Sequence, residues 1–552
     1  MSLSLRGGRL AVAVVAALAV LLAFLGLRRG DEGTPGTPPY LTIVLLDGLS
    51  ARVFQDELDA GHLPEMADLI EKGALIQHGV GAFPSMTAYG FYPFITGQDA
   101  ARSGVLGLRW FDRGRESGNL RSYVGATQDL MNADWVAAPA TLFERVRPQH
   151  TFTINSYANR GVSRSAKVGW SFAMAKYRRV AWQPWLLGAV PLLGGELAPA
   201  WERAEDRAVA AAIDDLAREP KVQWITISSL DGHQHVQGTD ARYTELLRHA
   251  DVLLARYRAA SRSRGQEPQR VYALLSDHGV ADARQSADLR GTLSDCCGLR
   301  AQRDTATRFR ASALDVPLSA YAGSDALVVI NGNMLNYVYL RDPEAPAGQE
   351  WRQPLKESQL SAYGERHVDV IGGLLQDPAV ELVILRGDAP GQSVVRGKDG
   401  FGVIAAEKNG LYRYRAEGTD PLGYTQRGLG DGLGRTAEQW LLSTHDTDYP
   451  DAVYRIAALM AEEDTGDLVV TAREGWDFGA GYELVVGNYH GGHGGLRADQ
   501  LRVPYVLAGP GVAHTRLPTA RAEDVGATLM TLLGLAPEAG TSGRVLSEAL
   551  SH

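Results

Sequence analysis

The sequence predicts an α/β protein in which helices cover both faces of a mostly parallel central sheet, with a β-rich cap subdomain inserted into it. Short, almost continuous apolar runs end in acidic or turn residues, as expected of strands buried on both faces. Amphipathic stretches lie between several of these runs, as expected of crossover helices. Residues 285–475 differ, because closely spaced β-rich runs follow one another there.

The predicted central strands share an apolar body and a polar end. They are YLTIVLLDG (40–48), TFTINSYA (151–158), VQWITISSLDG (222–232), RVYALLSDHG (270–279) and RVPYVLAGPG (502–511). The helical stretches 203–219 and 243–262 lie between strands of this set. Ligands of such sheets gather at the carboxyl ends of the strands. The acidic residues that end three strands, Asp47, Asp231 and Asp277, therefore mark the expected site.

The segment 285–475 is interpreted as an inserted cap within a catalytic domain that spans residues 40–552. Its runs DALVVINGNMLNYVYL, VELVILRGD and GFGVIAAEKNGLYRYRAEG are rich in β-formers. Asn409-Gly410 is a strong signal for a hairpin turn.

The N-terminus predicts a membrane anchor or a signal segment over residues 1–29. Arginines flank the apolar run LAVAVVAALAVLLAFLGL (10–27), whose length is close to the minimum for a helix that spans a bilayer. Residues 30–39 form a Gly/Pro-rich tether. We expect an exported protein anchored with its catalytic domain on the periplasmic side, or secreted if the segment is cleaved.

Composition narrows the possible partners. Hydrophobic residues make up 45% of the 552 residues and charged residues 22%, as in an ordinary globular protein. The net charge of −9 and the lack of a basic block exclude a nucleic acid polymer as an expected partner.

Cys296 and Cys297 are the two cysteines. Because adjacent cysteines pair only in a strained ring, we expect unpaired thiols and no cysteine-based metal site.

Several acidic and histidine residues have the spacing of metal ligands. Asp231 and His235 are four residues apart, so one helical turn after a strand places them on the same side. Asp277 and His278 are adjacent at a strand end, and Asp47 ends the first strand. Each residue alone also fits a turn, a helix cap or a structural histidine, but their recurrence at successive strand ends favours a metal site.

The glycine-rich NYHGGHGG adds His490 and His493 to these candidates. Oxygen and nitrogen ligands without thiolate suit Zn, Mn or Fe. These ligands divide naturally into two sites, the arrangement used for phosphoryl displacement.

The segment GAFPSMTAYGFYPFITG (81–97) contains two hydroxyl residues, Ser85 and Thr87. They follow a proline and precede a predicted helix, where either a helix cap or a nucleophile would fit.

Taken in order, these motifs resemble the alkaline phosphatase superfamily, and within it the type I phosphodiesterase/nucleotide pyrophosphatase branch. The resemblance is carried by LLDGL, FPSMTAYGFYPFITG, LDGHQH, SDHG, GHGGLRADQLRVPYVLAGPG and the ending DVGATLMTLLGLAPEAGTSGRVL. It implies an alkaline phosphatase-like fold and a metal-dependent hydrolase of phosphate esters, with diesters preferred over monoesters.

The resemblance also assigns roles to particular residues. It implies that Thr87 is the nucleophile and forms a phospho-threonine. It also implies that the site holds two divalent ions, Zn²⁺ in the first place with Mn²⁺ or Fe as alternatives, and that Thr87 is a ligand of one of them. The implied ligands are Asp47, Asp277 and His278 for the ion that contacts Thr87, and Asp231, His235 and His493 for the ion that faces the leaving group. His233 and His490 match no ligand position.

The chain departs from the branch at one position. The sequence also leaves open the role of Arg109, the exact reaction and the role of residues 177–195. Leu108 stands where nucleotide pyrophosphatases carry a phosphate-binding Asn. The neighbouring Arg109 could bind the phosphate through its guanidinium, or be a plain surface residue. A phosphomonoesterase, a phospho-group transferase and a non-catalytic scaffold are the alternative functions. YRRVAWQPWLLGAVPLLGG (177–195) fits either a buried loop or an interfacial membrane contact with a lipid-linked phosphate substrate.

Overall fold

The computed structural model describes residues 39–124, 127–135, 139–168, 190–303, 317–479, 489–538 and 540–551. The predicted N-terminal segment, nearly all of the tether and residues 177–189 of the tryptophan-containing stretch lie outside these ranges. Within the ranges, no helix combines the length and the apolar composition needed to cross a bilayer.

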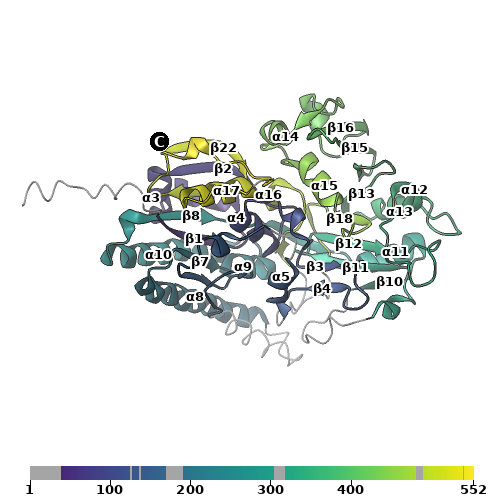
Figure 1. Cartoon of the computed structure of the whole chain (residues 1–552). Coiled ribbons are helices and arrows are strands. Elements are labelled where there is room, and N and C mark those ends of the chain that lie inside the picture. The colour runs from purple at the N-terminus through teal and green to yellow at the C-terminus, as the bar shows by residue number, and fades with distance from the viewer. Residues whose placement is uncertain are drawn as a thin grey trace, which may run out of the picture.

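The main sheet has eight strands. Their pairings confirm the predicted, mostly parallel arrangement, and Figure 1 shows the sheet with its helices. In spatial order the strands are β22 (Thr515–Arg521), β2 (Ala74–Val80), β21 (Arg502–Ala508), β8 (Arg270–Leu275), β1 (Tyr40–Leu46), β7 (Val222–Ile227), β5 (Thr151–Ile154) and β6 (Arg164–Ala166). All five predicted strands are present. β21 pairs antiparallel with both of its neighbours, whereas the other pairings of this sheet are parallel.

Both faces of the main sheet are buried, as the apolar strands predict. Along β1, Ile43 and Leu45 enter one core cluster, whereas Val44 and Leu46 enter another, because successive side chains of a strand point to opposite faces. One face is covered by α2 (Ala51–Asp59), α3 (Pro64–Lys72), α8 (Val190–Asp215) and α10 (Ala241–Ser263). The other is covered by α4 (Tyr92–Thr96), α6 (Leu142–Arg145) and α17 (Ala522–Leu532).

A second sheet of nine strands lies beside the main sheet and accounts for the predicted β-rich subdomain (Figure 1). Its order is β10 (Ala301–Arg303), β11 (Ala326–Asn331), β12 (Leu335–Leu340), β18 (Leu468–Ala472), β13 (Val380–Arg386), β14 (Gln392–Gly397), β15 (Gly400–Ala406), β16 (Leu411–Gly418) and β17 (Arg435–Thr436). Except for β10–β11, its strands pair antiparallel. The predicted hairpin at Asn409-Gly410 joins β15 and β16, and Gly410 has the left-handed φ of +80°.

Smaller elements complete the fold. They are the ribbon of β3 (Arg109–Phe111) and β4 (Leu120–Ser122), the sheet of β19 (Gly475–Asp477), β9 (Ala281–Ser286) and β20 (Gly491–Gly492), and the helices α5 (Leu130–Asp134), α9 (Ser229–Gln237), α11 (Leu289–Cys297), α12 (Glu357–Ser361), α13 (Val370–Leu375), α14 (Ala437–Thr444), α15 (Ala452–Met460) and α16 (Ala498–Leu501).

The expectation of unpaired thiols is wrong, because Cys296 and Cys297 are joined by a disulfide. The pair ends α11, and Gly298 follows it with a left-handed φ of +64°. A Cβ at Gly373 of α13 would lie within 3 Å of both sulfur atoms. The two sulfurs therefore pack together against a glycine of the neighbouring helix, an environment that the sequence pattern does not show.

The two sheets share one hydrophobic core. The cluster that contains Ile43 and Leu45 of β1 continues without a break to Tyr337 of β12 and Ile384 of β13. Trp440 of α14 belongs to the same cluster. The second sheet is therefore packed into the rest of the molecule and does not stand apart from it.

A buried ionic network joins the same two regions. Arg455 of α15 is 2% exposed and donates to Asp99 Oδ2 at 2.5 Å and to Glu523 Oε1 at 3.0 Å. Its Nη2 also donates to the Val80 carbonyl at 3.3 Å. One guanidinium thus connects α15, which lies in the chain between strands β17 and β18 of the second sheet, with the segment after α4 and with the first turn of α17.

We expect Arg455→Ala to destabilise the protein by roughly 3–5 kcal/mol, because it leaves the buried Asp99 and Glu523 carboxylates without their cation. The free energy of unfolding from urea titration is the measurement. Arg52→Ala, which breaks the exposed Arg52–Asp56 pair on α2, is the matched control and should cost less than about 1 kcal/mol. Equal effects of the two substitutions would contradict a supporting role for the buried network.

Candidate functional site: a cluster of carboxylates and histidines at the sheet edge

Three carboxylates converge at the carboxyl edge of adjacent strands. Asp47 follows β1, Asp277 follows β8, and Asp231 lies in the first turn of α9 after β7. Since β8, β1 and β7 are parallel neighbours, their ends meet at one edge of the sheet. The Asp231 N–H donates to the Asp47 carbonyl at 3.1 Å, and the Gly48 N–H lies 3.4 Å from Asp277 Oδ1.

Three histidines place a ring nitrogen against these carboxylates. His278 Nε2 lies 3.4 Å from both Asp47 Oδ1 and Asp277 Oδ2. His235 Nε2 and His493 Nε2 lie 3.3 Å and 3.5 Å from Asp231 Oδ1. The rings of His278 and His493 stack with their centroids 3.7 Å apart.

The other ring nitrogen of each histidine faces a backbone carbonyl. The Nδ1 atoms of His278, His235 and His493 lie 2.9, 3.1 and 2.8 Å from the carbonyls of Gly279, Gly491 and Ser85. A proton on Nδ1 leaves the lone pair on Nε2, which is the form that binds a metal ion. The backbone thus directs three Nε2 atoms toward the carboxylates.

The cluster contains two groups whose ligand atoms lie within 4.8 Å of one another: Asp47, Asp277 and His278, and Asp231, His278 and His493. The first group has the membership that the resemblance implies. The second differs from it, because His278 stands between the two groups and His235 lies at the margin, next to Asp231. Oxygen and imidazole donors without thiolate suit a divalent ion such as Zn²⁺ or Mn²⁺.

The electrostatics of the cluster favour cations. Burial raises the pKa of Asp47, and repulsion from Asp277 and Asp231 raises it further. Burial raises the pKa of Asp277 to about 6, against the opposing attraction of His278. Burial also acts to raise the pKa of Asp231, but His235 and His493 lower it below its usual range. Divalent ions would compensate the negative charge that the three carboxylates bring together here.

Thr87 lies inside this cluster. Its Oγ1 donates to Asp47 Oδ1 at 3.3 Å and lies 3.1 Å from His278 Nε2, and the residue is 7% exposed. The helix expected directly after Thr87 is less regular than predicted. Ala88 has a φ of +68°, and a 3₁₀ turn (Tyr89–Phe91) precedes the short α4. The helix dipole is therefore a small contribution here, and the neighbouring side chains dominate the environment of the hydroxyl.

Ser85 has a structural place beside Thr87. Its hydroxyl donates to the Gly495 carbonyl at 2.8 Å and accepts from the Gly494 N–H at 3.1 Å. Its own carbonyl is the one that faces His493 Nδ1. Ser85 thus joins the Thr87 loop to the His493 loop. The two residues of the Ser85–Gly495 bond are 410 positions apart in the chain.

Comparison with known proteins gives the family of the chain. Residues 41–397 match the model of the type I phosphodiesterase / nucleotide pyrophosphatase family. The chain belongs to this family. It is therefore a hydrolase that acts on phosphoric ester bonds, and its candidate metal groups agree with the metal dependence of the family.

Solved structures of similar fold include ectonucleotide pyrophosphatase/phosphodiesterase 5 (ENPP5, NPP5) from mouse and human. An inactive threonine-to-alanine variant of the murine protein in complex with AMP superimposes with a TM-score of 0.52 at 10% identity. The human protein superimposes with a TM-score of 0.51 at 12% identity. Each alignment covers 93% of this chain and 100% of the other, and at these identities the likeness shows the fold. No curated protein sequence matches the chain.

Three residues that the sequence analysis considered, His233, His490 and Arg109, lie outside the two groups of candidate ligands. His233 Nε2 pairs with Asp240 Oδ1 at 2.8 Å, and His490 is exposed, so neither belongs to the two groups. Arg109 is buried on β3, where its Nη1 donates to the Ile330 carbonyl at 3.4 Å. This places Arg109 at the junction with the second sheet, and its role toward a phosphate stays a prediction.

Sequence reasoning missed several residues that hold the cluster in place. The Tyr243 hydroxyl donates to the Gly48 carbonyl at 2.7 Å, and Glu205 Oε1 accepts from the Ser229 N–H at the start of α9 at 2.9 Å. Asn333, in the turn between β11 and β12, lies against His235. The Asn-Gly-Asn sequence at 331–333 was a signal for a tight polar turn, whereas nothing local marked Tyr243 or Glu205.

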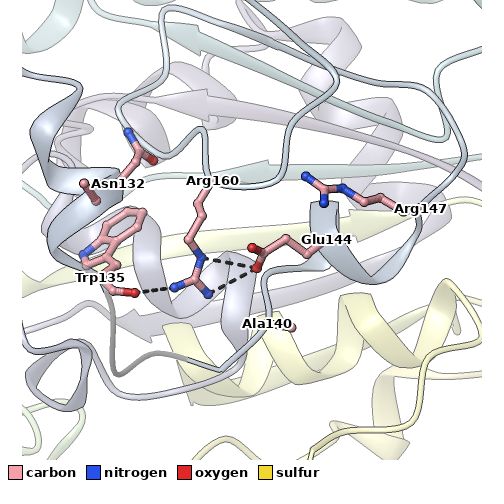
Figure 2. Close-up of a pocket in the computed structure, with 7 residues that line it drawn as sticks. Asn132, Trp135, Ala140, Glu144, Arg147 and Arg160 are labelled. Carbon is pink, nitrogen blue, oxygen red and sulfur yellow. Dashed lines mark hydrogen bonds and ion pairs between the residues drawn. The ribbon is translucent and has the colours of Figure 1, made fainter.

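A separate pocket of about 560 Å³ contains none of the cluster residues. It is lined by Asn132, Ala133, Trp135, Ala140, Glu144, Arg147 and Arg160. Figure 2 shows that the Arg160 guanidinium points to Glu144 and to the Trp135 carbonyl. Arg160 and Glu144 pair with each other, and neither Thr87 nor any candidate metal ligand lines the pocket. This pocket is therefore not the candidate active site.

Glu205→Gln is expected to change how stability depends on pH. Burial raises the pKa of Glu205 to about 7 from its usual 4.5, so ionisation is opposed in the folded state alone. The folded protein therefore loses stability as pH rises from about 4.5 through 7. Glutamine keeps an acceptor for Ser229 and cannot ionise. The stability advantage of the variant should grow by roughly 3 kcal/mol between pH 5 and pH 8.

Urea unfolding at both pH values measures this difference. Glu245→Gln, on the exposed side of α10, is the control and should change the stability by the same small amount at both pH values. A constant difference between wild type and Glu205→Gln would show that Glu205 ionises as readily in the folded as in the unfolded state.

Proposed function

We propose that the chain is a metal-dependent phosphodiesterase whose nucleophile is Thr87 and whose reaction passes through a phospho-threonine. The observation that carries the proposal is the position of Thr87 Oγ1, between Asp47 Oδ1 at 3.3 Å and His278 Nε2 at 3.1 Å. A hydroxyl placed among buried metal-type ligands is the arrangement that an activated nucleophile needs. The complex of the inactive murine ENPP5 variant with AMP supports a nucleotide-like phosphate ester as the substrate class.

The residues divide into two sets around the nucleophile. Asp47, Asp277 and His278 would hold a divalent ion next to Thr87. Asp231, His235 and His493 would hold a second ion on the leaving-group side, with His278 between the two. Such ions lower the pKa of a hydroxyl in contact with them and neutralise charge on the attacking and leaving oxygens.

The chain itself supplies the nucleophile and its orientation. The Thr87 hydroxyl points its proton at Asp47 Oδ1, which leaves a lone pair of Oγ1 available for attack on phosphorus. Attack forms the Oγ1–P bond and breaks the bond between phosphorus and the leaving oxygen, and the proton lost by the Thr87 hydroxyl balances the one that the leaving group takes up as an alcohol. Water then cleaves the phospho-threonine, which releases a phosphate monoester and regenerates the hydroxyl. Ser85 holds the loops of Thr87 and His493 in fixed positions relative to each other through both steps.

Substitution of Thr87 tests this proposal. Thr87→Ala should abolish hydrolysis of an aryl phosphodiester in the presence of Zn²⁺ or Mn²⁺, because the attacking oxygen is gone while every charged ligand stays. Thr87→Ser keeps a hydroxyl and should retain substantial turnover. Release of the coloured phenol is measured, together with bound metal in each purified variant.

Two further comparisons use the same assay. The matching aryl monoester should be the poorer substrate, and a strong preference for it would defeat the phosphodiesterase assignment. Added alcohols should form little new diester, whereas efficient transfer would make the chain a phospho-group transferase. Undiminished turnover by Thr87→Ala would show that another group attacks phosphorus.

We also propose that the protein is exported and tethered to a membrane by the apolar run at residues 10–27, with the catalytic domain on the extracytoplasmic side and a lipid-linked phosphate ester within reach. The run is long enough to span a bilayer and is flanked by arginines. The full chain should sediment with membranes and resist extraction by high salt. Removal of residues 1–36 should release it, and a soluble full chain would contradict the tether.

A further inference from the structure

The turn between β11 and β12 extends from the second sheet into the candidate metal site. The His493 N–H donates to the Gly332 carbonyl at 2.8 Å, and the Met334 N–H donates to the His493 carbonyl at 2.9 Å. A Cβ on Gly332 would lie 2.7 Å from His493 Nδ1, so a larger residue would displace the ring. The turn 331–334 is therefore built to the shape of the His493 loop.

Asn333 is the side chain of this turn that reaches a second histidine. It is 5% exposed and has a left-handed φ of +72°, a conformation that Asn tolerates better than most residues. Its Nδ2 lies 3.1 Å from His235 Nδ1. The Asn333 carbonyl accepts from the Phe478 N–H at 2.8 Å, so the backbone of the turn is held independently of the amide.

The Asn333 amide and the Gly491 carbonyl both contact the Nδ1 side of the His235 ring. Both lie 3.1 Å from His235 Nδ1, while His235 Nε2 faces Asp231 at 3.3 Å. An Asn amide can hold either form of the ring, because its oxygen accepts from a protonated Nδ1 and its nitrogen donates to an unprotonated one. Partners of the second ring nitrogen orient a metal-binding histidine and tune its basicity.

We propose that Asn333 is a positioning residue of the leaving-group side of the site, through which the second sheet sets the orientation of His235. This inference rests on the proposed function. It gives the second sheet a part in the reaction: His235 is at the margin of the ligand cluster, and the amide of Asn333 keeps its Nε2 directed at the Asp231 carboxylate. Loss of the amide should therefore weaken stabilisation of the leaving oxygen more than activation of Thr87.

Asn333→Gly removes the amide while permitting the left-handed backbone, and a series of aryl phosphodiesters with phenols of different acidity is the assay. Hydrolysis of esters with weakly acidic phenols should fall by roughly 10–100-fold, because these leaving groups need the most stabilisation. Esters with strongly acidic phenols should change little. Zn²⁺ calorimetry on the metal-free protein should show one of two binding events weakened by about 10-fold or more.

Two variants control for folding and for loss of an asparagine. Asn333→Asp tolerates the same backbone and places a carboxylate oxygen at the position of the amide, where it can accept from a protonated His235 Nδ1, so it should restore both readouts close to wild type. Asn155→Gly is matched in backbone, because Asn155 also has a left-handed φ of +55°, and its amide bonds to the Val168 backbone. This variant should behave as wild type in both assays.

Equal loss for all phenols, or two unchanged Zn²⁺ binding events in Asn333→Gly, would overturn the inference. Failure of the wild-type protein to hydrolyse any diester would instead defeat the proposed function. In that case the calorimetric comparison still decides whether Asn333 supports the His235 site, since it requires metal binding and no turnover.

Discussion

The convergence of three carboxylates at one sheet edge, with Asp47 and Asp277 buried and Asp231 half-buried, is the constraint on which the rest of the site depends. Asp47, Asp231 and Asp277 are brought together by the neighbouring ends of β1, β7 and β8, and their mutual repulsion is strong in a region away from water. Positive charge must therefore be supplied locally. The three histidines, each held by a backbone carbonyl, present Nε2 atoms that can accept cations, and Thr87 lies where those cations would act.

His278 has a central position in this arrangement. It contacts Thr87, Asp47 and Asp277, and its ring stacks on His493 of the other group. A displacement of this one ring would disturb both groups together. The close stacking also explains why the loop of His493 must be tied to the Thr87 loop. Ser85 ties them through two hydrogen bonds of its hydroxyl and one contact of its carbonyl with the His493 ring.

The strand-end motifs could be predicted from sequence because a local rule governs them. A buried parallel strand ends at the sheet edge, so the sequence alone predicts that Asp47, Asp231 and Asp277 lie near one another. The structure brings these residues, their histidines and Thr87 together. The antiparallel direction of β21 was not predictable, since strand direction depends on connections made far from the strand itself.

Residues that support the cluster from a distance could not be found in this way. Glu205 reaches α9 from α8, and Asn333 reaches His235 from the second sheet, so neither has a sequence neighbour that signals its role. The pairing of Cys296 with Cys297 likewise depends on their packing against Gly373 of another helix. Local patterns describe strands and ligands well, and they carry little information about contacts between distant elements.

The shared core of the two sheets has a consequence for how such an enzyme can vary. Tyr337 and Ile384 of the second sheet bury their side chains in the same cluster as Ile43 and Leu45 of the main sheet. Deletion of the second sheet would expose that apolar surface to water and remove Asn333 and Gly332 as well. This chain therefore cannot be shortened to a minimal catalytic module, and diversification is confined to loops that leave the joint core intact.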